Sequence, residues 1–433
     1  MENEDRRLSI SIGNKTKDIA RLQSFCQEAG SNAKSLVVHA SISDDQVEPF
    51  ADALRANPSL TSITLDLPEI SDSGFDHLST LFNRSLRSLG IWANRLTSKG
   101  LEALAQNLLT CPRLERLDLY ATQCDRHDLT FGDAGVDCLA RALERQRKIM
   151  TYVGVRQNAI SDVGVANLMT SLQRKTYVVE TLNLQGNNIT SVGVSHIARM
   201  LKESGDCLKE LSLEGNSLIG DDGAILLADA LSSPTARLES LNLKSCAISD
   251  AGAMRFAQVL SSSSSSLREL ILDGNSSLGD KSVELIARAL ARNSTLTRLG
   301  LKSCRVGDEG TVQLARSLRE NRCLEHLLLD NNEIGDAGAI ELADALQRNR
   351  TLKYLSLTKT RIGGQGRAKL TRSLEFNSVM LEIALASEAN ASSTDLRAVE
   401  GLLAKNREIE KLRRELETCR RERDEALAQL AGK

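Results

Sequence analysis

Apolar and polar positions follow a repeating unit of about 28 residues, seen most clearly in residues 324–351, LEHLLLDNNEIGDAGAIELADALQRNRT. Leu327 and Leu329 alternate at strand spacing, so both side chains are expected on one face of a short β-strand. Leu342 and Leu346 then recur at helical spacing. The unit predicts a strand followed by a helix, and their apolar faces need a neighbouring copy to become buried.

The turn between this strand and helix has its own polar pattern. Asn332 carries both donors and an acceptor, and we expect it to satisfy backbone groups that would otherwise be buried without partners. Asp336 is expected to be the N-cap of the helix. Gly338 lies in the first helical turn, where a glycine allows close approach of another backbone segment.

The unit recurs along most of the 433 residues. Successive central strand positions are 26–30 residues apart, except for one step of 36 residues between Leu117 and Val153. Such regular spacing predicts a solenoid of about 13 stacked repeats. The central strand positions are Leu36, Ile63, Leu89, Leu117, Val153, Leu182, Leu211, Leu241, Leu270, Leu299, Leu327, Leu355 and Ile383.

The position of Asn332 is also repeated, which predicts a structural ladder of asparagines along the turns. Cys246 and Cys304 occupy this position in two repeats, and Thr122 and Thr360 occupy it in two others. The first-turn glycine recurs too, with Ser282 in its place once. The asparagine ladder consists of Asn94, Asn158, Asn187, Asn216, Asn275 and Asn332.

The pattern LxxLxLxxNxI, followed by GDAG and a helix, resembles the leucine-rich repeat of the ribonuclease-inhibitor-like class. Ran GTPase-activating proteins and NOD-like receptors carry similar repeats. The resemblance covers about residues 33–390 and implies an α/β right-handed solenoid, or horseshoe, with a parallel sheet on its concave face and helices on its convex face. Neither GxxxxGK[ST] nor GxGxxG occurs, so the nucleotide-binding part of a NOD-like receptor is missing.

The two ends of the chain depart from the repeat and divide it into three parts. Residues 1–32 are expected to form an N-terminal cap, with a short strand around Ile10, and residues 33–392 the solenoid. Residues 393–433 are expected to form a C-terminal helix. That helix is either a single solvated helix whose first turns pack on the last repeat, or a short coiled coil that forms a homodimer through residues 402–430. Its loose heptad is Leu402, Ile409, Leu412, Leu416, Cys419, Ala426 and Leu430.

Composition narrows the possible partners and compartment. The net charge of −2 gives no global basic surface for nucleic acid, and no apolar run is long enough to span a membrane. The N-terminus is charged and lacks an apolar signal core. Nine cysteines without a CxxC pair indicate reduced thiols and a cytoplasmic location. The five histidines are scattered, so no metal site is expected.

One column of outward-facing residues is expected on the concave face, three positions after each central strand residue. From Glu214 to Asp330 the charges in this column alternate, which predicts a ladder of mutually neutralising pairs. The column reads Trp92, Tyr120, Arg156, Gln185, Glu214, Lys244, Asp273, Lys302, Asp330 and Thr358.

The aromatic end of this column is the predicted partner-binding site. Trp92 is the only tryptophan, and large aromatics and arginines are the residue types that binding hot spots use. The longest step between repeats places an inserted loop, residues 125–131, beside this region. The alternatives are that Trp92 simply packs on its neighbours, and that the loop is a tolerated surface insertion. The predicted site residues are Trp92, Tyr120, Tyr152, Arg156 and Phe131.

The sequence contains no Ser/His/Asp set, no metal-ligand spacing and no cofactor motif, so we expect a protein that is not an enzyme and needs no cofactor. The favoured function is an interaction scaffold that binds another protein through the concave face. The resemblance leaves two alternatives: a GTPase-activating protein for a small GTPase, and a cytoskeletal or ciliary scaffold. The C-terminal tail lacks the acidic block typical of Ran GTPase-activating proteins.

Overall fold

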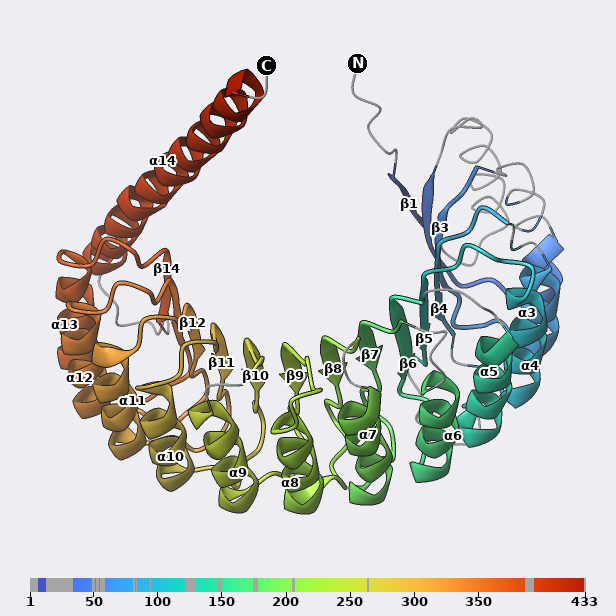
Figure 1. Cartoon of the computed structure of the whole chain (residues 1–433), viewed down its shortest axis with the longest axis horizontal. Coiled ribbons are helices and arrows are strands. Elements are labelled where there is room, and N and C mark those ends of the chain that lie inside the picture. The colour runs from blue at the N-terminus through green and yellow to red at the C-terminus, as the bar shows by residue number, and fades with distance from the viewer. Residues whose placement is uncertain are drawn as a thin grey trace. The chain divides into compact units, whose positions relative to one another are not determined.

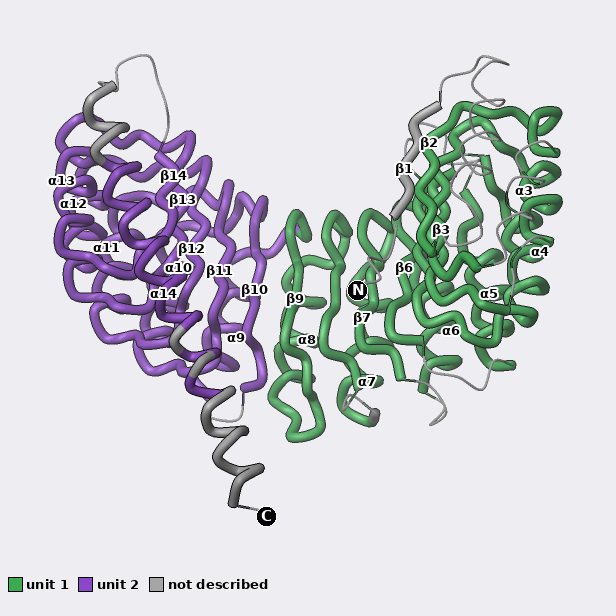
Figure 2. The backbone as a smooth tube through the Cα atoms, turned by 90° about the horizontal axis from the view of Figure 1, so that it is seen from above, with its two compact units in different colours: residues 1–246 green, residues 247–433 purple. Residues whose placement is uncertain are grey.

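A computed structural model describes residues 7–12, 34–48, 51, 54, 59–80, 82, 84–93, 95–121, 130–145, 150–173, 178–204, 207–262, 265–385 and 393–431. The chain divides into two compact units, Met1–Cys246 and Ala247–Lys433 (Figure 2). Each unit is built from parallel strands that follow one another in chain order, with helices on one face of the sheet (Figure 1).

The first unit contains nine described strands. They are β1 (Arg7–Ile12), β2 (Ser35–Ala40), β3 (Ser62–Asp66), β4 (Ser88–Trp92), β5 (Arg116–Tyr120), β6 (Tyr152–Arg156), β7 (Thr181–Asn183), β8 (Glu210–Ser212) and β9 (Ser240–Asn242). Its described helices are η2 (Asp44–Gln46), α3 (Asp72–Ser79), α4 (Ser98–Leu108), α5 (Gly132–Arg145), α6 (Asp162–Leu172), α7 (Ser191–Ser204) and α8 (Gly220–Leu231). Each strand therefore lies beside the strand of the next repeat.

The second unit continues the same alternation. Its strands are β10 (Glu269–Ile271), β11 (Arg298–Gly300), β12 (His326–Leu328), β13 (Tyr354–Leu357) and β14 (Glu382–Leu385). Its described helices are α9 (Asp250–Ser261), α10 (Asp280–Leu290), α11 (Asp308–Glu320), α12 (Asp336–Leu346), α13 (Gly364–Leu374) and α14 (Ser393–Ala431).

The predicted alternation of parallel strands and helices is confirmed. Leu327 in β12 pairs in register with Leu299 and Leu355 of the adjacent strands, and all three side chains are buried. This shared register stacks the leucines of successive repeats into one continuous core. The strand expected around Ile10 is β1, which precedes the 13 predicted repeats. The other residues of the predicted cap lie outside the described part of the chain.

Asn332 connects two consecutive repeats through its side chain. Its amide nitrogen donates to the carbonyl oxygens of Leu301 and Leu329, at 2.8 and 2.9 Å. Its amide oxygen accepts from the backbone N–H groups of Cys304 and Val306, both at 3.0 Å. The asparagine thereby satisfies buried backbone groups that the short strands leave unpaired. Asn158, Asn187, Asn216 and Asn275 are buried at the same position, whereas Asn94 lies outside the described residues.

The cysteines at this position replace only part of the asparagine's bonding. The thiols of Cys246 and Cys304 lie 3.2 Å from the carbonyl oxygens of Leu213 and Leu272, to which they donate. Burial raises the pKa of each thiol to about 12. Both cysteines are therefore protonated, buried structural residues at neutral pH.

The helix starts are joined by a ladder of aspartates, and here the prediction for Asp336 was wrong. The N-cap of α12 is Gly335, and Asp336 is the first helical residue. The Asp336 carboxylate instead accepts from the backbone N–H groups of Gly363 and Gly366 in the next repeat, at 2.7 and 2.8 Å. The first N–H groups of a helix have no partner within it, so each aspartate stabilises the helix start that follows.

This ladder explains the repeated glycine in the first helical turn. A Cβ atom on Gly338 would lie 2.8 Å from Oδ1 of Asp308 and 2.9 Å from the Cβ of Thr311. A side chain at this position would therefore collide with the preceding repeat. Ser282 is the exception, and its hydroxyl group donates to the carboxylate of Asp250.

We expect Asp308→Ala to destabilise the protein by about 1–3 kcal/mol, because it leaves the N–H groups of Gly335 and Gly338 without their acceptor. Glu309→Ala is the matched control, since this neighbouring acid is in the same helical turn but exposed. Denaturant unfolding followed by circular dichroism measures both. Equal midpoints for the two variants would contradict a stabilising role of the ladder.

The first turns of α14 continue the packing of the second unit. Val399 and Leu403 are buried, and the amide of Asn406 donates to the carbonyl oxygens of Asn377 and Met380, both at 2.9 Å. Asn349 and Asn377, which follow α12 and α13, likewise donate to carbonyl oxygens of the preceding repeat. The next turn, residues 411–415, is exposed. The coiled coil over residues 402–430 stays a prediction, and Leu402, its first seam residue, is only half-buried.

Candidate protein-interaction surface

The sheet face opposite the helices, called here the open face, displays the first, third and fifth residues of the longer strands. Register places Trp92 beside Tyr120, and Tyr120 beside Arg156, at the ends of β4, β5 and β6. Tyr152 lies at the start of β6, opposite Arg116. The structure therefore brings four of the five predicted site residues onto three consecutive strands, and all four are half-buried.

The fifth-position residues form a row of side chains in mutual contact. The ring centroids of Trp92 and Tyr120 lie 6.1 Å apart in an edge-on arrangement. The guanidinium carbon of Arg156 lies 4.4 Å from the Tyr120 ring centroid, which is cation–π distance. On the other side, the His39 ring lies 6.1 Å from the Trp92 ring, and its Nδ1 is 3.0 Å from the Asp66 carboxylate. Trp92 does pack on Tyr120, yet both keep exposed surface.

The first-position residues of β5 and β6 form a second stacked pair. The guanidinium carbon of Arg116 lies 3.4 Å from the ring centroid of Tyr152. Burial raises the pKa of Tyr152 above its ordinary value, and the nearby carboxylate of Asp118 adds to the shift. The phenol therefore stays neutral and serves as a flat surface that holds the arginine in place.

Asp118 joins the two rows and was missed in the sequence. It is the third residue of β5, only 7% exposed, and it forms a two-point ion pair with Arg156. The Nε–Oδ1 and Nη2–Oδ2 distances are 3.1 and 2.9 Å. Arg156 therefore has a charged partner, which is a third-position residue and not a member of its own column.

Two glycines make room around Asp118. Gly90 and Gly154 are its register neighbours on β4 and β6. A Cβ atom on Gly154 would collide with the Asp118 carboxylate, so the glycine is required for this ion pair. Gly90 likewise contributes no side chain beside Asp118 on the β4 side. The G-x-W pattern of β4 and the G-x-R pattern of β6 are the sequence signal for this arrangement.

Phe131 does not belong to the candidate surface, so that prediction was wrong. Its side chain is 5% exposed and packs against Gly135, four residues later. Ile160 stands in the same relation to Gly164 in the next repeat, and it is also buried. Phe131 is thus the inward-pointing turn residue of its repeat. The rest of the predicted overhanging loop, residues 125–129, lies outside the described residues.

The charged residues of the predicted ladder are paired within each unit. In the first unit, Lys244 Nζ lies 2.7 Å from a carboxylate oxygen of Glu214. In the second unit, Lys302 Nζ lies 2.9 Å from Asp330. Burial opposes ionisation of Asp330, but hydrogen bonds from two neighbouring hydroxyl groups and from Lys302 outweigh it and hold its pKa below the ordinary value. These residues neutralise one another.

The second unit carries a stacked pair on its own open face. The rings of His326 and Tyr354, the first residues of β12 and β13, lie 4.2 Å apart and are tilted by only 11°. Burial and the positive charge of Arg298 lower the pKa of His326. Neither His326 nor Tyr354 belongs to the fifth-position column, and this pair was not predicted from the sequence.

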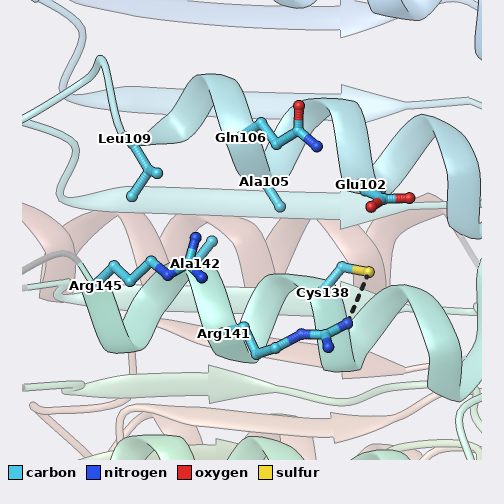
Figure 3. Close-up of a pocket in the computed structure, with 8 residues that line it drawn as sticks. All are labelled: Glu102, Ala105, Gln106, Leu109, Cys138, Arg141, Ala142 and Arg145. Atoms are coloured by element: carbon cyan, nitrogen blue, oxygen red, sulfur yellow. Dashed lines mark hydrogen bonds between the residues drawn. The ribbon is translucent and has the colours of Figure 1, made fainter.

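A shallow groove lies on the helical side of the first unit (Figure 3). Glu102, Gln106 and Leu109 line it from the α4 side, and Cys138, Arg141 and Arg145 line it from α5. Arg141 donates to the Cys138 sulfur at 3.5 Å and also pairs with Asp137 at 2.9 Å.

Within the described residues, no group of histidine, cysteine, aspartate and glutamate side chains could hold a metal ion.

Comparison with known proteins agrees with the repeat geometry. Six segments match the family described as Leucine Rich repeat: residues 178–198, 207–228, 238–257, 292–315, 320–343 and 348–370. The chain is a leucine-rich repeat protein. No curated protein matches this leucine-rich repeat sequence. None of the described helices combines the length and the apolar character needed to cross a membrane.

The chain is similar to several solved structures at low sequence identity. The yeast Rad7 and Elc1 complex matches with a TM-score of 0.51 and 18% identity, covering 80% of this chain and 85% of that chain. Leiomodin-1 actin-binding site 2 matches with a TM-score of 0.36 and 20% identity, covering 39% of this chain and 96% of that one. The tropomodulin C-terminal domain of Caenorhabditis elegans has a TM-score of 0.35 and 16% identity, with 37% and 97% covered.

Proposed function

We propose that this leucine-rich repeat protein is a non-catalytic scaffold that binds another protein through the open face of β4, β5 and β6. The observation that carries the proposal is the cluster of Trp92, Tyr120, Tyr152 and Arg156 on three adjacent strands. Aromatic and arginine side chains supply most of the binding energy in protein interfaces. Rad7, from the yeast structure that is similar to this chain, is in a complex with another protein, Elc1.

The exposure and order of these residues support binding. A strand residue on the open face has no core to fill, so a half-exposed Trp92 and Tyr120 need another reason to be there. Their rings are held by mutual contact and by Arg156, which limits the side-chain entropy lost when a partner docks. The surface is therefore preorganised for a partner.

The ionisable groups of this surface favour binding over catalysis. Asp118 is engaged by Arg156 through both carboxylate oxygens. Both of its oxygens are therefore occupied by one guanidinium group. The raised pKa of Tyr152, caused mainly by burial, makes its phenol a weaker acid. The cluster offers shape and charge but no acid–base pair.

Affinity purification followed by mass spectrometry tests the proposal. The bait proteins are the wild type, the double variant Trp92→Ala/Tyr120→Ala, and Lys302→Ala as a control on the open face of the second unit. We expect a set of proteins that the wild type and Lys302→Ala recover and the double variant loses. The same set recovered by all three baits would contradict the assignment of the surface.

The exposed part of α14 gives a second, separate prediction. Ending the chain after Glu410 keeps the buried residues Val399, Leu403 and Asn406 but removes most of the predicted coiled-coil seam. We expect this truncation to convert a dimer into a monomer in light scattering at about tens of micromolar protein. Leu412→Asp is the point-mutant counterpart, since Leu412 is exposed on the isolated chain. A wild-type chain that is already monomeric at this concentration would refute the predicted coiled coil.

A further inference from the structure

Two arginines on the open face share a single buried carboxylate. Arg116 and Arg156 both approach Asp118, but at unequal distances. Arg156 makes the two-point contact with both oxygens. The Nη2 of Arg116 remains 3.9 Å from Oδ2, which is beyond hydrogen-bond distance. Within the described part of the chain, Asp118 is the acid that pairs with Arg116, so this group carries a surplus of one positive charge.

Arg116 is held in place by Tyr152, and its guanidinium donors are not used in a close ion pair. Its guanidinium lies flat on Tyr152, with 3.4 Å between the guanidinium carbon and the ring centroid, and its side chain keeps 45% of its surface exposed. Stacking fixes the orientation of the planar guanidinium and leaves its edge donors available. An arginine restrained in this way loses less entropy on binding than a mobile one.

The aromatic row lies at the other end of the same strand. Arg116 and Tyr120 are the first and last residues of β5 and point to the same face. With a rise of about 3.3 Å per residue, their backbones are separated by about 13 Å. Between them β4 contributes no side chain, because Gly90 stands opposite Asp118. One extended peptide segment can reach both ends.

We propose that Arg116 binds the side-chain carboxylate of an aspartate or glutamate in a partner protein, and that Trp92 and Tyr120 take an apolar side chain of the same segment. The inference rests on the proposed function and specifies the partner's chemistry. A carboxylate accepts two parallel hydrogen bonds from a guanidinium edge. The acidic and apolar residues of the partner lie within about four positions of each other in an extended segment.

Charge favours a carboxylate over a phosphate group. One carboxylate matches the single surplus positive charge around Asp118. A phosphate group carries about −1.5 to −2 charges at neutral pH. It would add uncompensated negative charge beside Asp118. A phosphorylated segment is therefore an outcome that the test must distinguish.

Selection from a random dodecapeptide display library tests the inference on the full chain. We expect wild-type protein to enrich peptides with an acidic residue within about four positions of an aromatic or large aliphatic residue. Arg116→Ala should lose this enrichment. Arg298→Ala is the matched control, because Arg298 holds the same strand position in β11 with a similar exposure of 40%. Absence of acidic enrichment on the wild type would overturn the inference.

Binding of the best enriched peptide is then measured through the fluorescence of Trp92, the only tryptophan. Arg116→Ala should weaken binding by about tenfold to a hundredfold, as expected for losing hydrogen bonds to a charged group. A peptide with glutamine or asparagine in place of the acid should show a similar loss. Arg116→Lys should fall between wild type and Arg116→Ala. Equal affinity for the acidic and amide peptides, or tighter binding of a phosphoserine version, would contradict a carboxylate partner.

The two proposals fail in different ways. If proteins captured by the wild type depend on Trp92 and Tyr120 but not on Arg116, the scaffold function stands and the acidic partner is refuted. If capture is independent of all three residues, the binding surface itself is refuted. Circular dichroism of each variant confirms that the fold is retained, because these side chains lie on the open face.

Discussion

Replacing Leu329 with alanine is expected to lower the free energy of unfolding by about 2–5 kcal/mol. Leu329 is fully buried directly after β12, where its backbone N–H donates to the carbonyl oxygen of Ser356 in the adjacent repeat at 2.8 Å. Deleting its side chain removes apolar contacts and leaves a cavity that repeats on both sides restrict from collapsing. A repeat protein couples such a defect to its neighbours, so the unfolding midpoint should move clearly.

Leu218→Ala is the control for this prediction. Leu218 is the same residue type in the same repeat architecture, but it is among the exposed large apolar residues. Its replacement should change stability by no more than about 0.5 kcal/mol. Denaturant titration followed by circular dichroism measures both variants. Similar midpoints for Leu329→Ala and Leu218→Ala would refute the assignment of Leu329 to the stacked core.

Trp92→Ala and Tyr120→Ala should each weaken binding of the protein partner about thirtyfold, which corresponds to about 2 kcal/mol. Each removes a large ring from the edge-on pair at the ends of β4 and β5. The remaining ring also loses the neighbour that fixes its orientation. Surface plasmon resonance with the immobilised partner gives the dissociation constants without relying on tryptophan fluorescence.

Lys302→Ala is the comparison for this pair. Lys302 is paired with Asp330 on the open face of the second unit, and such a paired surface charge contributes more to association rate and specificity than to affinity. Its effect should therefore be much smaller than thirtyfold. Equal losses for all three variants would contradict a localised hot spot. Loss of folding in Trp92→Ala would show that Trp92 supports the core instead of binding a partner.

Much of the fold could be predicted because one constraint recurs. Leucines at strand spacing, a polar turn residue and an amphipathic helix can be stacked in only a few ways, and the register of Leu299, Leu327 and Leu355 follows directly. The position of Asn332 in the turn also follows from its donors and acceptors. Repetition allows the same inference to be checked in every copy.

Contacts between neighbouring repeats could not be read as easily. Asp336 looked like a cap for its own helix, whereas its acceptors serve the helix of the next repeat. Asp118 was overlooked because its importance depends on glycines opposite it in two other strands. Phe131 was placed in the inserted loop, although the turn that follows the insertion restores the repeat and buries its ring.

The tail shows a similar limit at the end of the array. The heptad pattern begins at Leu402, but the last repeat buries Leu403 and Asn406 of the same helix. Helical periodicity alone does not say whether an apolar residue packs on its own chain or on another one. The next turn, where Leu412 is 54% exposed, is the part on which a coiled coil depends.

Site-specific photo-crosslinking tests the central claim most directly. A photoreactive residue in place of Ser88, which begins β4 beside Arg116 on the open face, is compared with one in place of Val163, an exposed residue of α6 on the helical side. The account predicts that the partner crosslinks at position 88 and not at position 163. Crosslinking at position 163 alone, or equally at both positions, would contradict binding through the open face of β4, β5 and β6.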